Sequence, residues 1–213
     1  MGDDDPVLTM VKVDKFEVSP TSADASMRLE GEGWAGYDLN KLWFTTDVEG
    51  DQHGTETAEL ELYYSRAIAP FWDLQAGLRR DFRPRPGQDW LALGVKGLAP
   101  YFFEMDAVLY AADGDDFGVD VSIEYELLFT QRLILSPEVE VTAFSFHDRA
   151  RGQGDGLSTL EAGLRLRYEV RREFAPYVGI HWEKLYGGTA DYAQEEGEDD
   201  SDVTLVVGIR AWF

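Results

Sequence analysis

Apolar and polar side chains alternate along most of the chain, in blocks of about ten residues separated by turns. In the block 119–127, every odd-numbered residue is apolar or aromatic and every even-numbered residue is polar. A period of two places these sets on opposite faces of a β-strand, whereas an amphipathic helix needs a period near 3.6. The sequence therefore predicts an all-β protein.

The same rule predicts about twelve antiparallel strands. We expect them near 8–18, 26–36, 40–49, 56–66, 71–82, 89–98, 101–112, 118–128, 133–146, 157–169, 175–186 and 202–213. The connections alternate between short apolar turns and longer polar loops, which we place at 19–26, 50–55, 82–88, 113–117, 147–156 and 187–201. We treat 1–7 as an N-terminal remnant or tag and 8–213 as one barrel domain.

Four features indicate that lipid covers the apolar face. The strands are long enough to cross hydrocarbon when tilted, and the loop lengths differ between the two ends. The chain ends on an apolar strand whose last residue is Phe213. Aromatic residues lie next to the short turns, as an interfacial belt requires: Tyr37, Trp43, Phe71, Trp72, Tyr101, Phe102, Phe103, Tyr168 and Tyr177. The prediction is a transmembrane up-and-down β-barrel of the bacterial outer membrane, with short periplasmic turns and longer extracellular loops.

Composition excludes several classes of function. The formal net charge of -22 leaves no basic surface for nucleic acid. The absence of cysteine removes disulfides and thiolate metal sites, and no apolar run is long enough for a membrane-spanning helix. Ser145 and His147 share a strand face without a supporting motif, so we expect no enzyme. A soluble β-barrel from a halophile is the alternative that such a charge also suits.

Closure of a lipid-embedded sheet turns its polar face toward a lumen. By parity, the charged residues facing this lumen are Glu30, Glu32, Lys41, Glu59, Glu61, Asp73, Arg79, Lys96, Glu104, Asp106, Asp120, Glu124, Glu126, Glu138, Glu140, Arg165, Arg167, His181, Glu183 and Arg210. Carboxylates outnumber bases in this set, so we expect a narrow, partly plugged interior that attracts cations. The alternative is that these residues form structural salt-bridge ladders.

The candidate metal ligands come from this lumen set. They are His181, Glu183, Glu104, Asp120 and Glu124, because copper(II) favours imidazole together with carboxylate. His53 and His147 fall in loops, where they are adventitious ligands or plain surface. The acidic run 195–202 is either a divalent-cation loop or a solvated loop, and it lacks EF-hand spacing.

Several segments resemble the barrel of the copper resistance protein B family. They are 39–43, 64–77, 97–104, 126–137, 174–180 and 207–213, and they span nearly the whole chain in the expected order. The resemblance implies an outer-membrane protein of Gram-negative bacteria that acts in copper tolerance. It also implies copper ions as the bound or transported species, and a periplasmic multicopper oxidase or copper-binding protein as partner.

One feature departs from the family pattern. Members usually carry a Met- and His-rich segment ahead of the barrel, and this chain has only four methionines. Either that segment was trimmed or this member lacks it. We expect the barrel to bind, sequester or pass copper through its acidic lumen. The alternatives are a structural anchor for a periplasmic copper-handling protein and a general small-cation pore.

Overall fold

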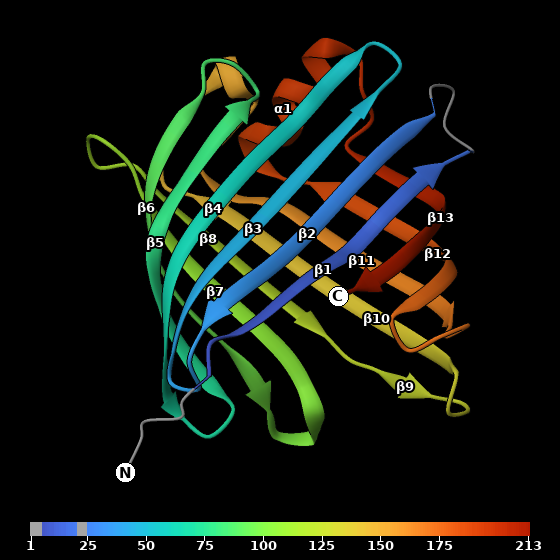
Figure 1. Ribbon diagram of the computed structural model, residues 1–213. Coiled ribbons are helices and arrows are strands. Elements are labelled where there is room, and N and C mark those ends of the chain that lie inside the picture. Colours follow the sequence, from blue (N-terminus) through green and yellow to red (C-terminus); the bar gives the residue numbers. More distant parts are fainter. Residues whose placement is uncertain (1–5, 21–24) are drawn as a thin grey trace.

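The strands of the computed structural model form one antiparallel sheet that closes on itself (Figure 1). The structure describes residues 6–20 and 25–213. The strands are β1 (Leu8–Ser19), β2 (Ser26–Gly36), β3 (Asn40–Asp51), β4 (Gly54–Ala69), β5 (Trp72–Arg83), β6 (Gln88–Ala99), β7 (Phe103–Ala111), β8 (Phe117–Glu124), β9 (Leu127–Leu128), β10 (Leu133–Phe144), β11 (Gly156–Tyr168), β12 (Phe174–Leu185) and β13 (Ser201–Trp212). Apart from β8 and β9, which both pair with β10, strands that are neighbours in sequence pair with each other, and β1 pairs with β13 to close the barrel.

The barrel has twelve strands, because β8 and β9 are two pieces of one strand. Both pair with β10, and the chain leaves the ladder between them at Tyr125 and Glu126. The predicted fold class is confirmed, and the strand bounds agree closely with the alternation. The expected remnant or tag at 1–7 falls mainly on residues 1–5, which lie outside the described residues.

The apolar rows of the strands cover the outside of the barrel. Leu60 and Leu62 of β4 are 45% and 48% exposed, whereas Tyr63, the residue after Leu62, is 2% exposed. The same contrast separates exposed Leu91 and Leu93 from buried Trp90 on β6. A soluble barrel would bury such rows in its core, so the halophile alternative is wrong and hydrocarbon is the solvent that these rows require.

The aromatic belt is present at the short turns, but the prediction is wrong for two residues. Phe71 and Tyr101 are 74% and 82% exposed. Trp43 and Tyr177 are instead buried in the barrel interior, at 9% and 5% exposure. Their nearness to a turn suggested the belt, but strand parity decides which way a side chain faces. Trp43 shares the inward face of β3 with Lys41.

The two ends of the barrel differ. The short-turn end carries the connections around 37–39, 70–71 and 100–102, the last being a 3₁₀ turn that starts before β7. The opposite, loop end carries helix α1 (Gly187–Glu196), which contacts β11. In the described residues, no helix has the length and apolar character needed to cross a membrane.

Two predicted loops have unexpected structure. The segment 187–201 is predicted as a polar loop, but α1 occupies two thirds of it. The loop predicted at 50–55 is a tight turn instead, since β3 continues to Asp51 and β4 begins at Gly54. The Asp51 carboxylate accepts hydrogen bonds from the backbone N–H groups of His53 at 2.7 Å and Gly54 at 3.0 Å, which stabilises this turn.

A β-bulge in β1 changes the parity of that strand. Its register with β2 shifts between Val13 and Lys15. The bulge supplies one extra residue, so the side chains of Asp14 and Lys15 both reach the interior. Parity alone does not predict this arrangement.

Candidate functional site in the barrel lumen

The lumen contains a cavity of about 480 Å³ with a carboxylate-rich wall. Its acidic lining residues are Asp14, Glu30, Glu32, Asp47, Glu59, Glu61, Glu104, Asp106, Asp120, Glu124, Glu138 and Glu140, and its basic ones are Lys12, Arg28, Arg79 and Lys96. The predicted excess of carboxylates over bases is therefore confirmed. Such a wall, enclosed by low-dielectric protein and lipid, attracts cations.

A network of ion pairs fills the lumen beside this cavity. The Lys15 ammonium on β1 lies 2.8 Å from Glu30 on β2 and 2.8 Å from Glu138 on β10. Arg165 on β11 lies 2.7 Å from the other oxygen of Glu138 and 2.5 Å from Glu17 on β1. These contacts join opposite walls and leave a partly plugged interior, as the narrow twelve-stranded barrel led us to expect.

Arg28 links the two sides of the lumen nearer the loop end. Its guanidinium lies 2.7 Å from Asp47 on the neighbouring strand β3 and 3.4 Å from Glu161 on β11. Four strand steps separate β2 from β11 around the barrel. Salt-bridge ladders thus exist, as the structural alternative supposed, but they neutralise only part of the acidic wall.

Four carboxylates form a row across adjacent strands. Glu140 is the register partner of Glu161, Glu161 of Glu183, and Glu183 of Asp202. Like charges directly opposite each other on neighbouring strands repel. In residues 6–20 and 25–213, Arg28 is the only lysine or arginine within 4.0 Å of any member. We call these four residues the acidic row.

The predicted ligands fall in separate places along the lumen. Glu104 on β7 and Glu124 on β8 are register partners, and Arg210 approaches Glu124 to 3.4 Å. Asp120 accepts a hydrogen bond from the Thr142 hydroxyl at 2.7 Å. In the described part of the chain, neither Glu104 nor Asp120 has a basic nitrogen within 4.0 Å.

His181 and Glu183 face the lumen as predicted, but their closest partner is a third residue. The His181 Nε2 atom lies 3.5 Å from a carboxylate oxygen of Glu161 on β11. Glu161 was not among the predicted ligands. Its parity matches that of Arg165, so the alternation already placed it on this face.

No preformed metal centre is present in the described residues. Within 6–20 and 25–213, no three or more His, Asp or Glu side chains are grouped closely enough to hold an ion. His147 lies at the loop end with its Nε2 atom 3.1 Å from Asp155, away from the lumen carboxylates.

At the loop end, the connection between β10 and β11 folds inward. Residues 145–155 connect β10 to β11 and include a 3₁₀ turn at Arg149–Arg151. The Arg151 side chain is 2% exposed and forms an ion pair with Asp81 of β5. Asp81 also accepts hydrogen bonds from Arg79 Nε at 2.7 Å and Trp90 Nε1 at 2.9 Å. We call this group the Asp81 latch.

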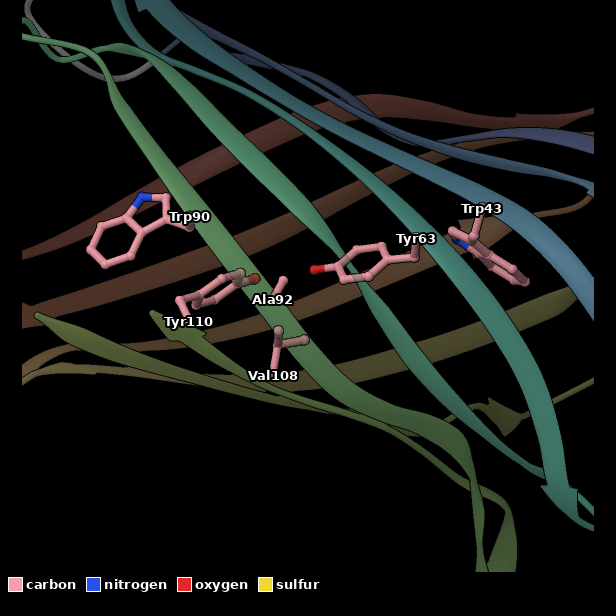
Figure 2. Close-up of a cluster of buried hydrophobic side chains, with 6 residues drawn as sticks. All are labelled: Trp43, Tyr63, Trp90, Ala92, Val108 and Tyr110. Carbon is pink, nitrogen blue, oxygen red and sulfur yellow. The ribbon is translucent and has the colours of Figure 1, made fainter. Parts of the chain in front are cut away.

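Aromatic side chains line the wall from β3 to β7. Figure 2 shows Trp43, Tyr63, Tyr110 and Trp90 following one another along this wall, and we call them the aromatic row. Trp43 and Tyr63 are cross-strand partners, and the Trp90 and Tyr110 ring centroids are 6.3 Å apart. These residues are core packing for the lumen, and three of them, Trp43, Tyr63 and Tyr110, also line the cavity.

Several lumen residues were absent from the predicted set. Asp14, Lys15 and Glu17 were missed because the β1 bulge hides their direction from a parity count. Arg28, Asp47, Asp81 and Glu161 share the parity of neighbours that were included, so the alternation could have found them. Arg151 had no signal, because loop residues follow no period.

Comparison with known proteins identifies relatives over nearly the whole chain. Residues 7–213 match the family model described as "Copper resistance protein B precursor (CopB)". The chain is 41% identical over 210 residues to Copper resistance protein B of Escherichia coli, covering 99% of this chain and 71% of that protein. It is 40% identical over 200 residues to Copper resistance protein B homolog of Pseudomonas syringae pv. tomato, covering 94% and 68%.

Solved porin structures share the fold. A NanC porin superposes with a TM-score of 0.60 at 10% identity, covering 96% of this chain and 99% of that one. A KdgM porin superposes with a TM-score of 0.56 at 12% identity, covering 97% and 99%. Together with the lipid-facing rows, this likeness places the barrel in the bacterial outer membrane, with outer-membrane lipid as its surroundings.

Proposed function

Because this chain belongs to the copper resistance protein B family and forms an outer-membrane barrel, we propose that its lumen gives copper ions a weak, carboxylate-lined route or sequestration surface. The acidic row is the observation that carries this proposal. Its carboxylates are register partners on four adjacent strands, and Arg28 is their one lysine or arginine partner among the described residues, so a cation relieves their repulsion.

The dispersed ligands suit passage better than tight storage. Copper(II) accepts imidazole and carboxylate ligands, which His181, Glu161 and Glu183 offer along one stretch of wall. An ion that is held tightly does not leave, whereas several weak sites in succession let it move. In this proposal the barrel binds and passes ions and catalyses no reaction.

Two other roles are compatible with the same barrel. A structural anchor for a periplasmic multicopper oxidase or copper-binding protein would need no ion movement through the lumen. A general small-cation pore would pass calcium as readily as copper. We favour the copper route over both because the histidine beside the acidic row adds a nitrogen ligand. Copper binds imidazole nitrogen well, whereas calcium binds oxygen ligands.

Liposomes that contain the purified protein and an enclosed copper-sensitive dye test the proposal. The test variant is Glu104→Gln, Asp120→Asn and Glu183→Gln, which neutralises three lumen carboxylates that lack a basic partner within 4.0 Å in the described chain. The matched control is Glu196→Gln, Glu198→Gln and Asp199→Asn, three exposed residues outside the lumen. These two variants remove equal charge.

We expect copper influx to fall in the lumen variant and to persist in the control. A further His181→Gln exchange should lower copper influx without changing calcium influx. Equal influx in wild type and the lumen variant would refute the route. No influx in any protein would favour the anchor, and equal copper and calcium influx would favour the general pore.

A further inference from the structure

The aromatic row runs nearly the length of the barrel wall. Trp43 lies three residues from the start of β3 at the short-turn end, and Trp90 two residues from the start of β6 at the loop end. Tyr63 and Tyr110 lie between them, as Figure 2 shows. All four are at least nine-tenths buried, so their rings are shielded from bulk water. Indole and phenol are the protein side chains that most readily lose one electron apart from those containing sulfur.

Three members of the row donate hydrogen bonds to carboxylates. The Tyr63 and Tyr110 hydroxyls donate to the two oxygens of Glu61 at 3.1 and 2.8 Å. Trp90 Nε1 donates to Asp81 at 2.9 Å. A phenol that loses an electron becomes strongly acidic, so a carboxylate already bonded to it accepts its proton. One carboxylate, Glu61, thus serves both tyrosines.

Nearby cations oppose positive charge on these rings. The Arg79 guanidinium lies 4.8 Å from the Tyr110 ring centroid, and the Lys96 ammonium lies 4.8 Å from that of Trp43. A ring in this field is oxidised only if its proton leaves with the electron. Trp43 Nε1 has no hydrogen-bond partner in the described structure, so Trp43 has no acceptor there for its proton.

The two tyrosines also border the space that a copper ion would occupy. Tyr63 and Tyr110 line the same cavity as Asp106 and Asp120. An oxidant formed on an ion in that cavity therefore meets phenols with a built-in proton acceptor before it meets the exposed aromatic belt.

We propose that the aromatic row is an oxidation site that takes up the oxidising equivalent formed when copper in the lumen reacts with peroxide. This inference rests on the proposed function. Copper(I) gives one electron to hydrogen peroxide and yields copper(II), hydroxide and a hydroxyl-level oxidant. That oxidant removes one electron from Tyr110 and becomes a second hydroxide, while the phenolic proton moves to Glu61.

The product is a neutral Tyr110 radical that can exchange with its neighbours. When Tyr63 gives an electron to Tyr110, Glu61 returns a proton to Tyr110 and receives one from Tyr63, so charge and atoms balance. Trp90 can replace Tyr63 as the electron donor by releasing its proton to Asp81, while Glu61 returns its proton to Tyr110. The radical thereby rests on three buried rings and is kept away from lipid.

Rapid mixing of purified protein in detergent micelles tests the proposal. Copper(I) is added without oxygen, hydrogen peroxide follows, and the frozen sample is read by electron paramagnetic resonance. We expect a neutral tyrosyl signal that is lost in Tyr63→Phe/Tyr110→Phe. Matched control Tyr37→Phe/Tyr101→Phe changes two exposed tyrosines and should keep the signal. Glu61→Gln should weaken it, because the proton acceptor is gone.

Each variant is first checked for the folded barrel by its heat-dependent mobility in electrophoresis. Phenylalanine keeps the ring, so the paired variants should pass. Peptide mass spectrometry then locates oxidised residues, which we expect at Tyr63, Tyr110 and Trp90 and not at Trp43. A signal that survives the Tyr63/Tyr110 variant, or oxidation centred on exposed tyrosines, overturns the proposal.

A copper-free oxidant separates this inference from the proposed function. A ruthenium tris-bipyridine complex with persulfate removes electrons under light and needs no ion in the lumen. If light gives the tyrosyl signal and copper with peroxide does not, copper fails to reach the cavity, and both the route and the copper-linked oxidation are overturned. If copper enters liposomes yet neither oxidant gives the signal, only the oxidation site is overturned.

Discussion

The Asp81 latch predicts an asymmetric response to removing either partner of its ion pair. Asp81 is held by three donors, from Arg79, Trp90 and Arg151. Arg151 has Asp81 as its only carboxylate within 4.0 Å in the described chain, and its Nε atom has no hydrogen-bond partner there. Loss of the Asp81–Arg151 contact therefore leaves Asp81 with two donors but leaves the Arg151 charge without a carboxylate partner.

The structure sets the expected magnitudes. Asp81→Asn leaves the buried Arg151 charge uncompensated, which costs about 3–5 kcal/mol. Arg151→Met leaves Asp81 with Arg79 and Trp90, so the loss is close to one charge-assisted hydrogen bond, about 1.5–3 kcal/mol. The double variant should lose less free energy of unfolding than the sum of the two single losses, because it contains no buried Arg151 charge without a partner. Arg149→Met is the control, because Arg149 is largely exposed and its ion pair contributes about 0–1 kcal/mol.

Urea titration of the barrel in lipid vesicles, followed by tryptophan fluorescence, measures the free energy of unfolding. Trypsin cleavage at Arg151 measures release of the inward-folded loop. If this loop opens before the barrel unfolds, the measured loss in the free energy of global unfolding is smaller. We expect Asp81→Asn to be cleaved fastest and wild type to be protected. Equal losses for Asp81→Asn and Arg151→Met, or strictly additive losses in the double variant, would refute the reasoning.

Two further stability predictions follow from the lumen packing. Lys15→Met should lower the free energy of unfolding by about 3 kcal/mol, because Glu30 and Glu138 lose their shared cation while remaining partly solvated and near other bases; the same urea titration measures it, and an unchanged midpoint contradicts it. Gly77→Ala should cost about 1–3 kcal/mol, because an added Cβ would lie 2.0 Å from the Leu62 carbonyl oxygen; a fully stable variant would show that β4 and β5 can separate there.

The sequence could predict which way most side chains face, because the barrel has two different solvents. Leu60 and Leu62 meet lipid and Glu61 meets the lumen, so each residue reports its face through its polarity. The same logic placed Glu183 and His181 inside. It also gave the strand bounds, since a turn interrupts the alternation.

Contacts across the lumen could not be predicted from the sequence. Arg28 reaches Glu161, and Arg165 reaches Glu17, between strands whose relative height depends on the stagger of the closed sheet. Helix α1 was missed because its amphipathic pattern is weak, with Ala190 and Ala193 as its buried residues. The ligand pairing of His181 with Glu161 likewise depends on register.

The extra residue in β1 has a consequence for how the cylinder is completed. Lys15, beside the bulge, joins three strands that include β1, which closes against β13. A register shift of one residue at the β1–β13 pair would turn the Lys15 ammonium toward the lipid acyl chains. Glu30 and Glu138 would then lose their shared cation. The bulged strand β1 therefore favours the correct register of the closing β1–β13 pair, because a shifted register has a higher free energy.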